Sequence, residues 1–267
     1  MKFVISQDEL KKVQFTLGRL RSIVAQALLV FLIQYRRTAI GPLWMLVGPL
    51  LFISVIGALY AQINIADLAV FIPHLSIGLI FWTLISGVLT SSPSLFLSHR
   101  SQIKQGSRSI NEIAIGDLVS TLIAFLHQCI IIIGVMMFYS VPFTFWSLMF
   151  IPGVLVVLIN GYWVNIVLGI LGARYRDLSQ LLPAIMRIAF LATPIIWMVG
   201  EGGKGAIVGA YLLFNPFYHF IEIFRAPLLG QTVDPISWVI VCVISILGLL
   251  FARFMHAHYS RYVALWI

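Results

Sequence analysis

Charged residues are scarce in this chain of 267 residues, since only 10% are Asp, Glu, Lys or Arg whereas 61% are hydrophobic. Soluble globular domains have roughly a quarter of their residues charged. The mean hydropathy of +1.03 therefore indicates a membrane protein. At about 20 residues per crossing helix, five to seven spans fit, and no separate soluble domain of ordinary size fits beside them.

Cysteine and catalytic motifs are also sparse. The two cysteines, Cys129 and Cys242, lie inside long apolar runs, where a thiol usually packs as a small hydrophobic group. The sequence has no nucleophile elbow, zinc-protease motif, pair of intramembrane aspartates or phosphate-binding loop, and such motifs hold nucleophiles, metals and phosphates in place. We therefore expect no catalytic residue, no metal, no disulfide and no cofactor bound by this chain.

The first 38 residues carry seven Lys or Arg, with Asp8 and Glu9 as their only acids. Apolar residues recur at steps of three and four from Val13 to Phe31, which predicts an amphipathic helix. Its uncharged part, residues 22–34, is too short to span, and no signal-peptide cleavage site follows it. Residues 1–38 are predicted to form an interfacial helix on the cytoplasmic side.

Six apolar runs then predict six spans, at about residues 43–61, 68–98, 118–139, 145–171, 181–199 and 236–254. Residues 206–234 are apolar but broken by Asn215-Pro216, Ala226-Pro227 and Gly230. Pieces this short predict re-entrant or interfacial half-helices before the last span. The expected fold is an all-α polytopic membrane domain over residues 39–267.

Positive charge is distributed unevenly between the connections. Of the seventeen Lys and Arg residues, fourteen lie on the side of both termini, whereas only Lys204 and Arg225 lie on the other. Because positive charge marks the cytoplasmic side, both termini are predicted to be cytoplasmic. Arg187 lies inside the fifth run, close enough to extend to the same surface. This distribution favours a membrane role over nucleic-acid binding.

Aromatic residues form stripes on two predicted spans. Trp44, Phe52 and Tyr60 are spaced at multiples of four on the first, and Phe190 and Trp197 lie seven apart on the fifth. Sugars stack on aromatic faces, so a carbohydrate conduit is one interpretation. Plain packing in the bundle core or in an interfacial belt is the other.

Three motifs occur in order along the chain: Tyr35-Arg-Arg-Thr-Ala-Ile-Gly-Pro-Leu-Trp44, Ala173-Arg-Tyr-Arg-Asp-Leu178, and Asn215-Pro-Phe-Tyr-His-Phe220 followed by Arg225-Ala-Pro-Leu228. With them the chain resembles permeases of the ABC-2 class that export bacterial polysaccharides. Within that class it is most similar to O-antigen permeases, with teichoic acid and capsule permeases as close relatives. The resemblance extends from about residue 35 to the carboxy terminus.

The resemblance implies a half-transporter in the bacterial inner membrane. Two copies would form a channel for a lipid-linked glycan, and two copies of a separate ATP-binding cassette ATPase would bind ATP and Mg and drive it. It also implies that the connection 100–117 couples to the ATPase and that residues 201–234 form a periplasmic gate. Family members commonly carry an apolar-aromatic-proline patch in that connection, where this chain has Gly106-Ser-Arg-Ser-Ile-Asn-Glu112.

Candidate site residues follow in four groups. The channel is assigned to Trp44, Phe52, Tyr60, Phe190 and Trp197. The cytoplasmic entrance, which would attract the pyrophosphate of the substrate, is assigned to Arg36, Arg37, Arg174, Arg176 and Arg187. ATPase coupling is assigned to Arg100, Lys104, Arg108, Glu112 and Asp117, and the periplasmic gate to Asn215, Pro216, Glu222 and Arg225.

Several alternatives stay open. The same fold and partner would suit export of a drug or another lipid. Residues 174–177 are equally explained as a positive anchor with a local ion pair, and Asn215-Pro216 as a helix breaker and cap. An intramembrane enzyme is disfavoured by the missing catalytic motifs, and a channel by the absence of a charged ring or filter-like sequence.

Overall fold

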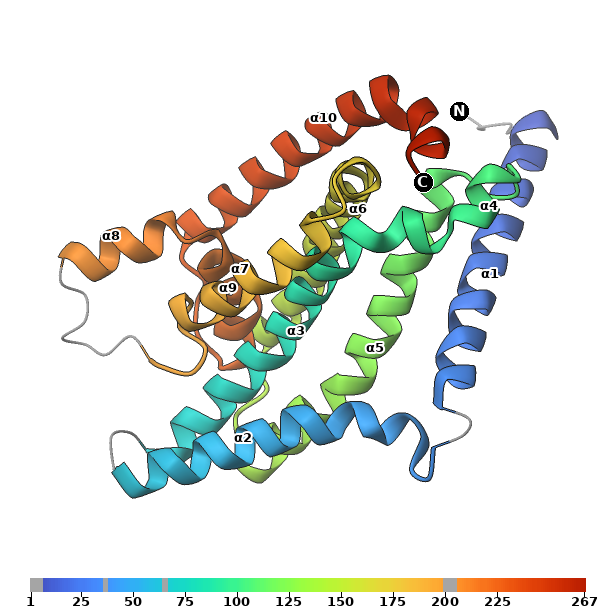
Figure 1. The fold of residues 1–267 in the computed structure, drawn as a ribbon. Helices are drawn as coiled ribbons and strands as arrows, with labels where there is room; N and C mark the ends of the chain where they lie inside the picture. Colours follow the sequence, from blue (N-terminus) through green and yellow to red (C-terminus); the bar gives the residue numbers. More distant parts are fainter. Residues whose placement is uncertain (1–6, 36–37, 64–66, 199–205) are drawn as a thin grey trace, which may run out of the picture.

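The computed structural model describes residues 7–35, 38–63, 67–198 and 206–267, and the regular structure in these ranges is helical (Figure 1). The longer helices are α1 (Gln7–Tyr35), α2 (Trp44–Ile63), α3 (Leu68–Ser98), α5 (Ile110–Phe138), α6 (Phe150–Arg174) and α10 (Pro235–Trp266). The shorter ones are η1 (Gly41–Leu43), α4 (Arg100–Lys104), η2 (Phe145–Met149), α7 (Leu178–Ala192), α8 (Ala206–Phe214) and α9 (Pro216–Leu228). The predicted all-α class is confirmed.

Five helical segments are long and apolar enough to cross a membrane: Gly41–Gln62, Leu68–Ser98, Ile110–Phe138, Phe145–Arg174 and Pro235–Trp266. They correspond to the first four and the last of the predicted runs. Residues 21–33 and α7 form shorter apolar helices. The chain is therefore a multi-pass membrane protein.

The fifth apolar run is shorter as a helix than the sequence suggests. α7 has 15 residues, which at 1.5 Å per residue is about 22 Å, less than the ~30 Å of a hydrocarbon core. A residue before proline is driven out of the α conformation, and Thr193, which precedes Pro194, has φ −96° and ψ 139°. The predicted span 181–199 is therefore not helical over residues 193–198.

Two other helices are longer than predicted. The Ser109 hydroxyl accepts a hydrogen bond from the Glu112 N–H at 3.2 Å, and the Glu112 carboxylate accepts one from the Ser109 N–H at 2.8 Å. This capping box starts α5 at Ile110, so residues 110–117 form its first two turns ahead of the predicted span 118–139. At the other end of the chain, α10 continues to Trp266, beyond the predicted end of the last span at residue 254.

α3 is the central helix of the bundle. Every residue from Phe71 to Trp82 is buried, because α3 packs against α2, α5, α6, α7 and α9. Figure 1 shows α3 running diagonally through the middle, with α1 beside α5. α6 approaches α3 so closely that a Cβ on Gly172 would overlap the backbone of Pro93. Only glycine fits at this crossing.

The two ends of the bundle have different contents. At one end, the end of α3 and the start of α5 meet the ends of α6 and α10 in a buried cluster that includes Phe96, Ile110, Ile170 and Val263. We call this the α4 end, because α4 contacts both α3 and α10 there. At the other, the α9 end, α9 packs against α3, α6 and the start of α10.

Candidate functional site

Arg225 on α9 is the centre of a buried polar network. Its side chain is 6% exposed, and its Nη2 donates to the Glu222 carboxylate at 2.7 Å. Its Nη1 donates to the Pro194 carbonyl oxygen at 2.5 Å and to His74 Nε2 at 3.1 Å. A buried charge is tolerated only when it is paired and hydrogen-bonded. Arg225 therefore joins α9 both to α3 and to the non-helical segment after α7.

Asn215 joins the same elements from the start of α9. Its Oδ1 accepts hydrogen bonds from the N–H groups of Phe217 at 3.0 Å and Tyr218 at 3.3 Å, and Pro216 occupies the first turn, where no N–H is required. Its Nδ2 donates to Thr193 Oγ1 at 3.2 Å. Asn215 is thus a helix cap that also holds α9 to the end of α7.

The four predicted gate residues therefore lie on or directly before one short helix. Burial raises the pKa of the Tyr218 hydroxyl on this helix, and the Glu222 carboxylate adds to the increase.

Sequence reasoning missed two buried partners of this network, His74 and Thr193, and also the buried His219 of α9. His219 Nε2 donates to the Leu213 carbonyl oxygen at 3.0 Å, and its Nδ1 lies 2.9 Å from Ser237 Oγ. A polar side chain within an apolar run is the signal that marks such residues, because it needs a buried partner.

Part of the predicted aromatic stripe is assembled by four helices. The rings of Phe52 on α2 and Phe190 on α7 pack edge to face at 5.8 Å between centroids. Trp82 on α3 lies 5.6 Å from Phe190 and 5.4 Å from Phe217 on α9. We call these four residues the aromatic cluster.

The other predicted channel residues lie outside this cluster. Tyr60 stacks on Phe71 at 3.8 Å and donates its hydroxyl proton to the Ile196 carbonyl oxygen at 2.6 Å. Trp197 donates its indole N–H to the Leu191 carbonyl oxygen at 3.1 Å. Both therefore hold the non-helical segment 193–198. Trp44, at the start of α2, is 52% exposed and joins neither arrangement.

The predicted entrance arginines are exposed where the structure describes them. The Arg174 guanidinium lies 5.7 Å from the Trp266 ring centroid, and Arg176 is exposed beside it. Arg187 is exposed on α7, directly after the buried Met186. Within the described residues, Asp177 forms no salt bridge with either neighbouring arginine. Arg36 and Arg37 lie outside the described residues.

The predicted coupling residues divide into two kinds. Arg100 and Lys104 are exposed on α4, and Arg108 is half-buried just before α5. Glu112 caps α5 and forms a salt bridge with Arg19 of α1 at 3.0 Å. The three basic residues can meet a partner surface, whereas Glu112 starts α5 and pairs with α1.

Asp117 belongs to a buried network that links three helices, which we call the Asn165 network. Its carboxylate accepts a hydrogen bond from Asn165 Nδ2 of α6 at 3.0 Å. Asn165 also donates to the Ala114 carbonyl oxygen at 3.2 Å and accepts from Ser92 Oγ of α3 at 2.6 Å. The first turns of α5 are therefore fixed to α3 and α6 together.

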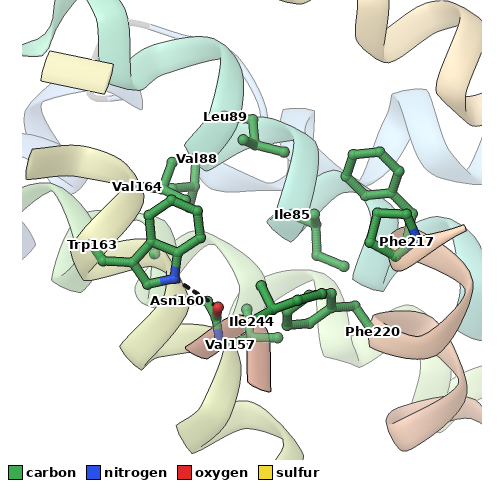
Figure 2. Close-up of a pocket in the computed structure, with 12 residues that line it drawn as sticks. Ile85, Val88, Leu89, Val157, Asn160, Trp163, Val164, Phe217, Phe220 and Ile244 are labelled. Atoms are coloured by element: carbon green, nitrogen blue, oxygen red, sulfur yellow. Dashed lines mark hydrogen bonds between the residues drawn. The ribbon is translucent and has the colours of Figure 1, made fainter. Parts of the chain in front are cut away.

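An apolar pocket of about 210 Å³ lies behind the start of α9 (Figure 2). Phe217 and Phe220 of α9 face Ile85 of α3 and Trp163 of α6 across it. The Trp163 indole N–H donates to Asn160 Oδ1 at 2.7 Å. The pocket leaves α9 room to repack against its neighbours.

Metal ligands are not gathered anywhere in the described ranges, which hold no group of three or more His, Cys, Asp or Glu placed to bind an ion.

A family model described as ABC-2 type transporter matches residues 24–229, well over half of the chain. The matched range includes the aromatic cluster, the Arg225 network and the connection 100–117. No curated protein matches the chain.

Proposed function

The chain belongs to the ABC-2 type transporter family, and from this membership we propose that it exports a lipid-linked polysaccharide of the O-antigen type. As a member it is a permease, the non-catalytic membrane component, and such permeases pair with ATP-binding cassette subunits. In the proposal, two copies of this chain and two ATPases form the exporter in the bacterial inner membrane. Both termini are cytoplasmic, and the ATPases bind ATP and Mg.

The observation that carries the glycan assignment is the contact between Phe52 and Phe190 within the aromatic cluster. Both rings are half-buried, so each is packed on one side and leaves part of its surface accessible. Stacking on aromatic faces holds sugars without charge, which suits a chain that must slide. The order of the three sequence motifs supports the same substrate class over a drug or a simple lipid.

Arginines at the α4 end support an anionic carrier on the substrate. Arg174 and Arg176 are exposed next to the end of α10, and Arg187 lies further along the exposed side of α7. With Arg36 and Arg37, they would attract the pyrophosphate of a lipid-linked glycan, because basic clusters at membrane surfaces bind anionic head groups. Replacing each of the five with Gln is expected to lower export.

The mechanism that we propose runs from α4 to α9. Closure of the ATPase subunits on ATP displaces the exposed basic residues of α4, and the Asn165 network passes this displacement from α5 to α3 and α6. Since α3 also holds Arg225 through His74, movement of α3 changes the position of α9. The pocket behind Phe217 and Phe220 gives α9 space to shift and open the far side.

Two experiments test the proposal. The tagged chain is purified in mild detergent from its own cells, and co-eluting proteins are identified by mass spectrometry and tested for vanadate-sensitive ATPase activity. Cells from which the chain is deleted are then examined for surface glycan. Loss of surface glycan in cells whose lipid composition is unchanged supports the polysaccharide substrate. Normal glycan with an accumulated lipid or drug would replace the substrate assignment and leave the permease class intact.

A further inference from the structure

A second pocket, of about 440 Å³, opens at the α4 end between α5, α6 and α10. Its polar lining comprises Asn111 at the start of α5, Tyr162 of α6, and Arg253 and His256 of α10. Its apolar lining includes Ile166 and Leu249. The pocket is separate from the Arg225 network and the aromatic cluster, and Asn111 is the one lining residue that it shares with the connection 100–117.

Hydrogen-bond donors converge on this pocket without a counter-charge. Arg253 and His256 are three residues apart on α10, so they share one face of the helix. Among the described residues, neither side chain has a hydrogen-bond or ion-pair partner, and no carboxylate lines the pocket. The Tyr162 hydroxyl donates to Asn111 Oδ1 at 3.2 Å. The amide oxygen of Asn111 is therefore occupied by the tyrosine, and its NH₂ group remains able to donate. Such a site suits an anion.

The depth of Arg253 identifies the source of that anion. α10 has no charged residue between Asp234 and Arg253. The 18 intervening residues extend about 27 Å along a helix, close to the ~30 Å thickness of the hydrocarbon core. Arg253 is thus the first charge after a membrane crossing, and it lies at the level of the phospholipid head groups.

We propose that this pocket binds the phosphate head group of an anionic phospholipid from the membrane leaflet at the α4 end. Arg253 and His256 contact the phosphate, and the Asn111 amide donates to a second oxygen. The acyl chains lie along Leu250 and Phe254 of α10, which are 61% and 50% exposed. This inference requires only that α10 crosses the membrane, and it does not depend on the proposed glycan substrate.

The test uses the full-length protein, delipidated in detergent and then supplied with phosphatidylglycerol or with phosphatidylcholine of the same acyl chains. Native mass spectrometry counts the retained lipids, and thermal unfolding follows their effect on stability. We expect phosphatidylglycerol to be retained preferentially and to raise the unfolding temperature more than phosphatidylcholine does. Equal retention of the two lipids would overturn the proposal.

Substitutions assign the effect to the pocket. Arg253→Gln is expected to weaken phosphatidylglycerol retention roughly fivefold, the effect of one basic residue at a charged membrane surface, and His256→Gln to weaken it less. Arg261→Gln is the matched control, because Arg261 lies on the same helix over the Tyr262 ring at 4.8 Å and outside the pocket lining. The proposal fails if both arginine variants lose the lipid equally, or if millimolar inorganic phosphate alone stabilises the protein as strongly as the lipid does.

Discussion

Arg225 donates a hydrogen bond to the carbonyl oxygen of Pro194 at 2.5 Å, so a side chain of α9 satisfies a backbone carbonyl in the non-helical segment that follows α7. Carbonyl groups at a helix end lack intrahelical partners and need others. Arg225 of α9 supplies such a partner close to the end of α7. The end of α7 and α9 are therefore joined, and separating them requires breaking a buried, charge-assisted hydrogen bond.

Arg225→Gln is expected to destabilise the protein strongly. The substitution leaves Glu222, whose side chain is 17% exposed, without its counter-charge, and it removes donors to Pro194 and His74. Removing one partner of a buried ion pair typically costs about 3 kcal/mol or more. Thermal unfolding in detergent measures the loss, with Arg261→Gln as the control, because Arg261 is exposed and lies outside this network. Equal unfolding temperatures for the wild type and Arg225→Gln would contradict the role of the network.

Asn215 has two functions that substitutions can separate. Asn215→Asp keeps the oxygen that caps α9 but loses the donor to Thr193, whereas Asn215→Ala loses both. Loss of an N-cap costs about 1 kcal/mol, and a lost buried hydrogen bond adds about 1 kcal/mol. We expect the order of unfolding temperature to be wild type, then Asp, then Ala. An Asp variant as unstable as the Ala variant would show that the cap contributes nothing.

Most of the long helices could be predicted from the sequence, because a long apolar run that crosses a membrane must satisfy its own backbone hydrogen bonds and therefore forms a helix. α3 begins and ends where its uncharged run does, from Leu68 to Ser98. Two boundaries were missed although their signals were present. Ser109 and Glu112 spell a capping box that starts α5, and Pro194 predicts the end of α7.

The Arg225 network was not readable in the same way. Its partners His74 and Pro194 lie 151 and 31 positions away, and only the packing of α3, α7 and α9 brings them together. The broken region 206–234 showed where short helices lie, and Glu222 and Arg225 stood out as charges within it. Which buried groups they contact depends on tertiary geometry that no local pattern encodes.

Glu112 has two contacts of unequal expected value. Its ion pair is with an Arg19 side chain that is 59% exposed, and exposed ion pairs contribute about 0–1 kcal/mol. Its capping-box role survives in Glu112→Gln, since glutamine also accepts from the cap residue. We expect Glu112→Gln to change the unfolding temperature little and Glu112→Ala to lower it clearly. Equal losses in the two variants would mean that the ion pair dominates.

Asn165→Leu tests whether the Asn165 network transmits movement from α5. The substitution keeps a similar volume but leaves the Asp117 carboxylate and Ser92 without their shared partner, at a cost of about 2 kcal/mol. In the complex with its ATPase, we expect ATP hydrolysis to continue while export per ATP falls. Asn160→Leu is the control on the same helix, because Asn160 bonds Ser245 of α10 at 2.6 Å instead. A matching fall in export per ATP in both variants would reduce the Asn165 network to a structural role.

Phe190→Leu separates sugar stacking from simple packing in the aromatic cluster. Leucine fills much of the same space, so the stability cost stays near 1.5 kcal/mol or below, but it offers no flat ring to a sugar. We expect severalfold less surface glycan with unchanged amounts of protein and ATPase activity, and recovery in Phe190→Tyr, which restores the ring. Phe125→Leu is the control, since Phe125 packs against Phe81 at 5.0 Å in the core and is only 2% exposed. If Phe190→Leu exports as well as the wild type, the ring serves packing alone and the conduit must be sought along another face of α7.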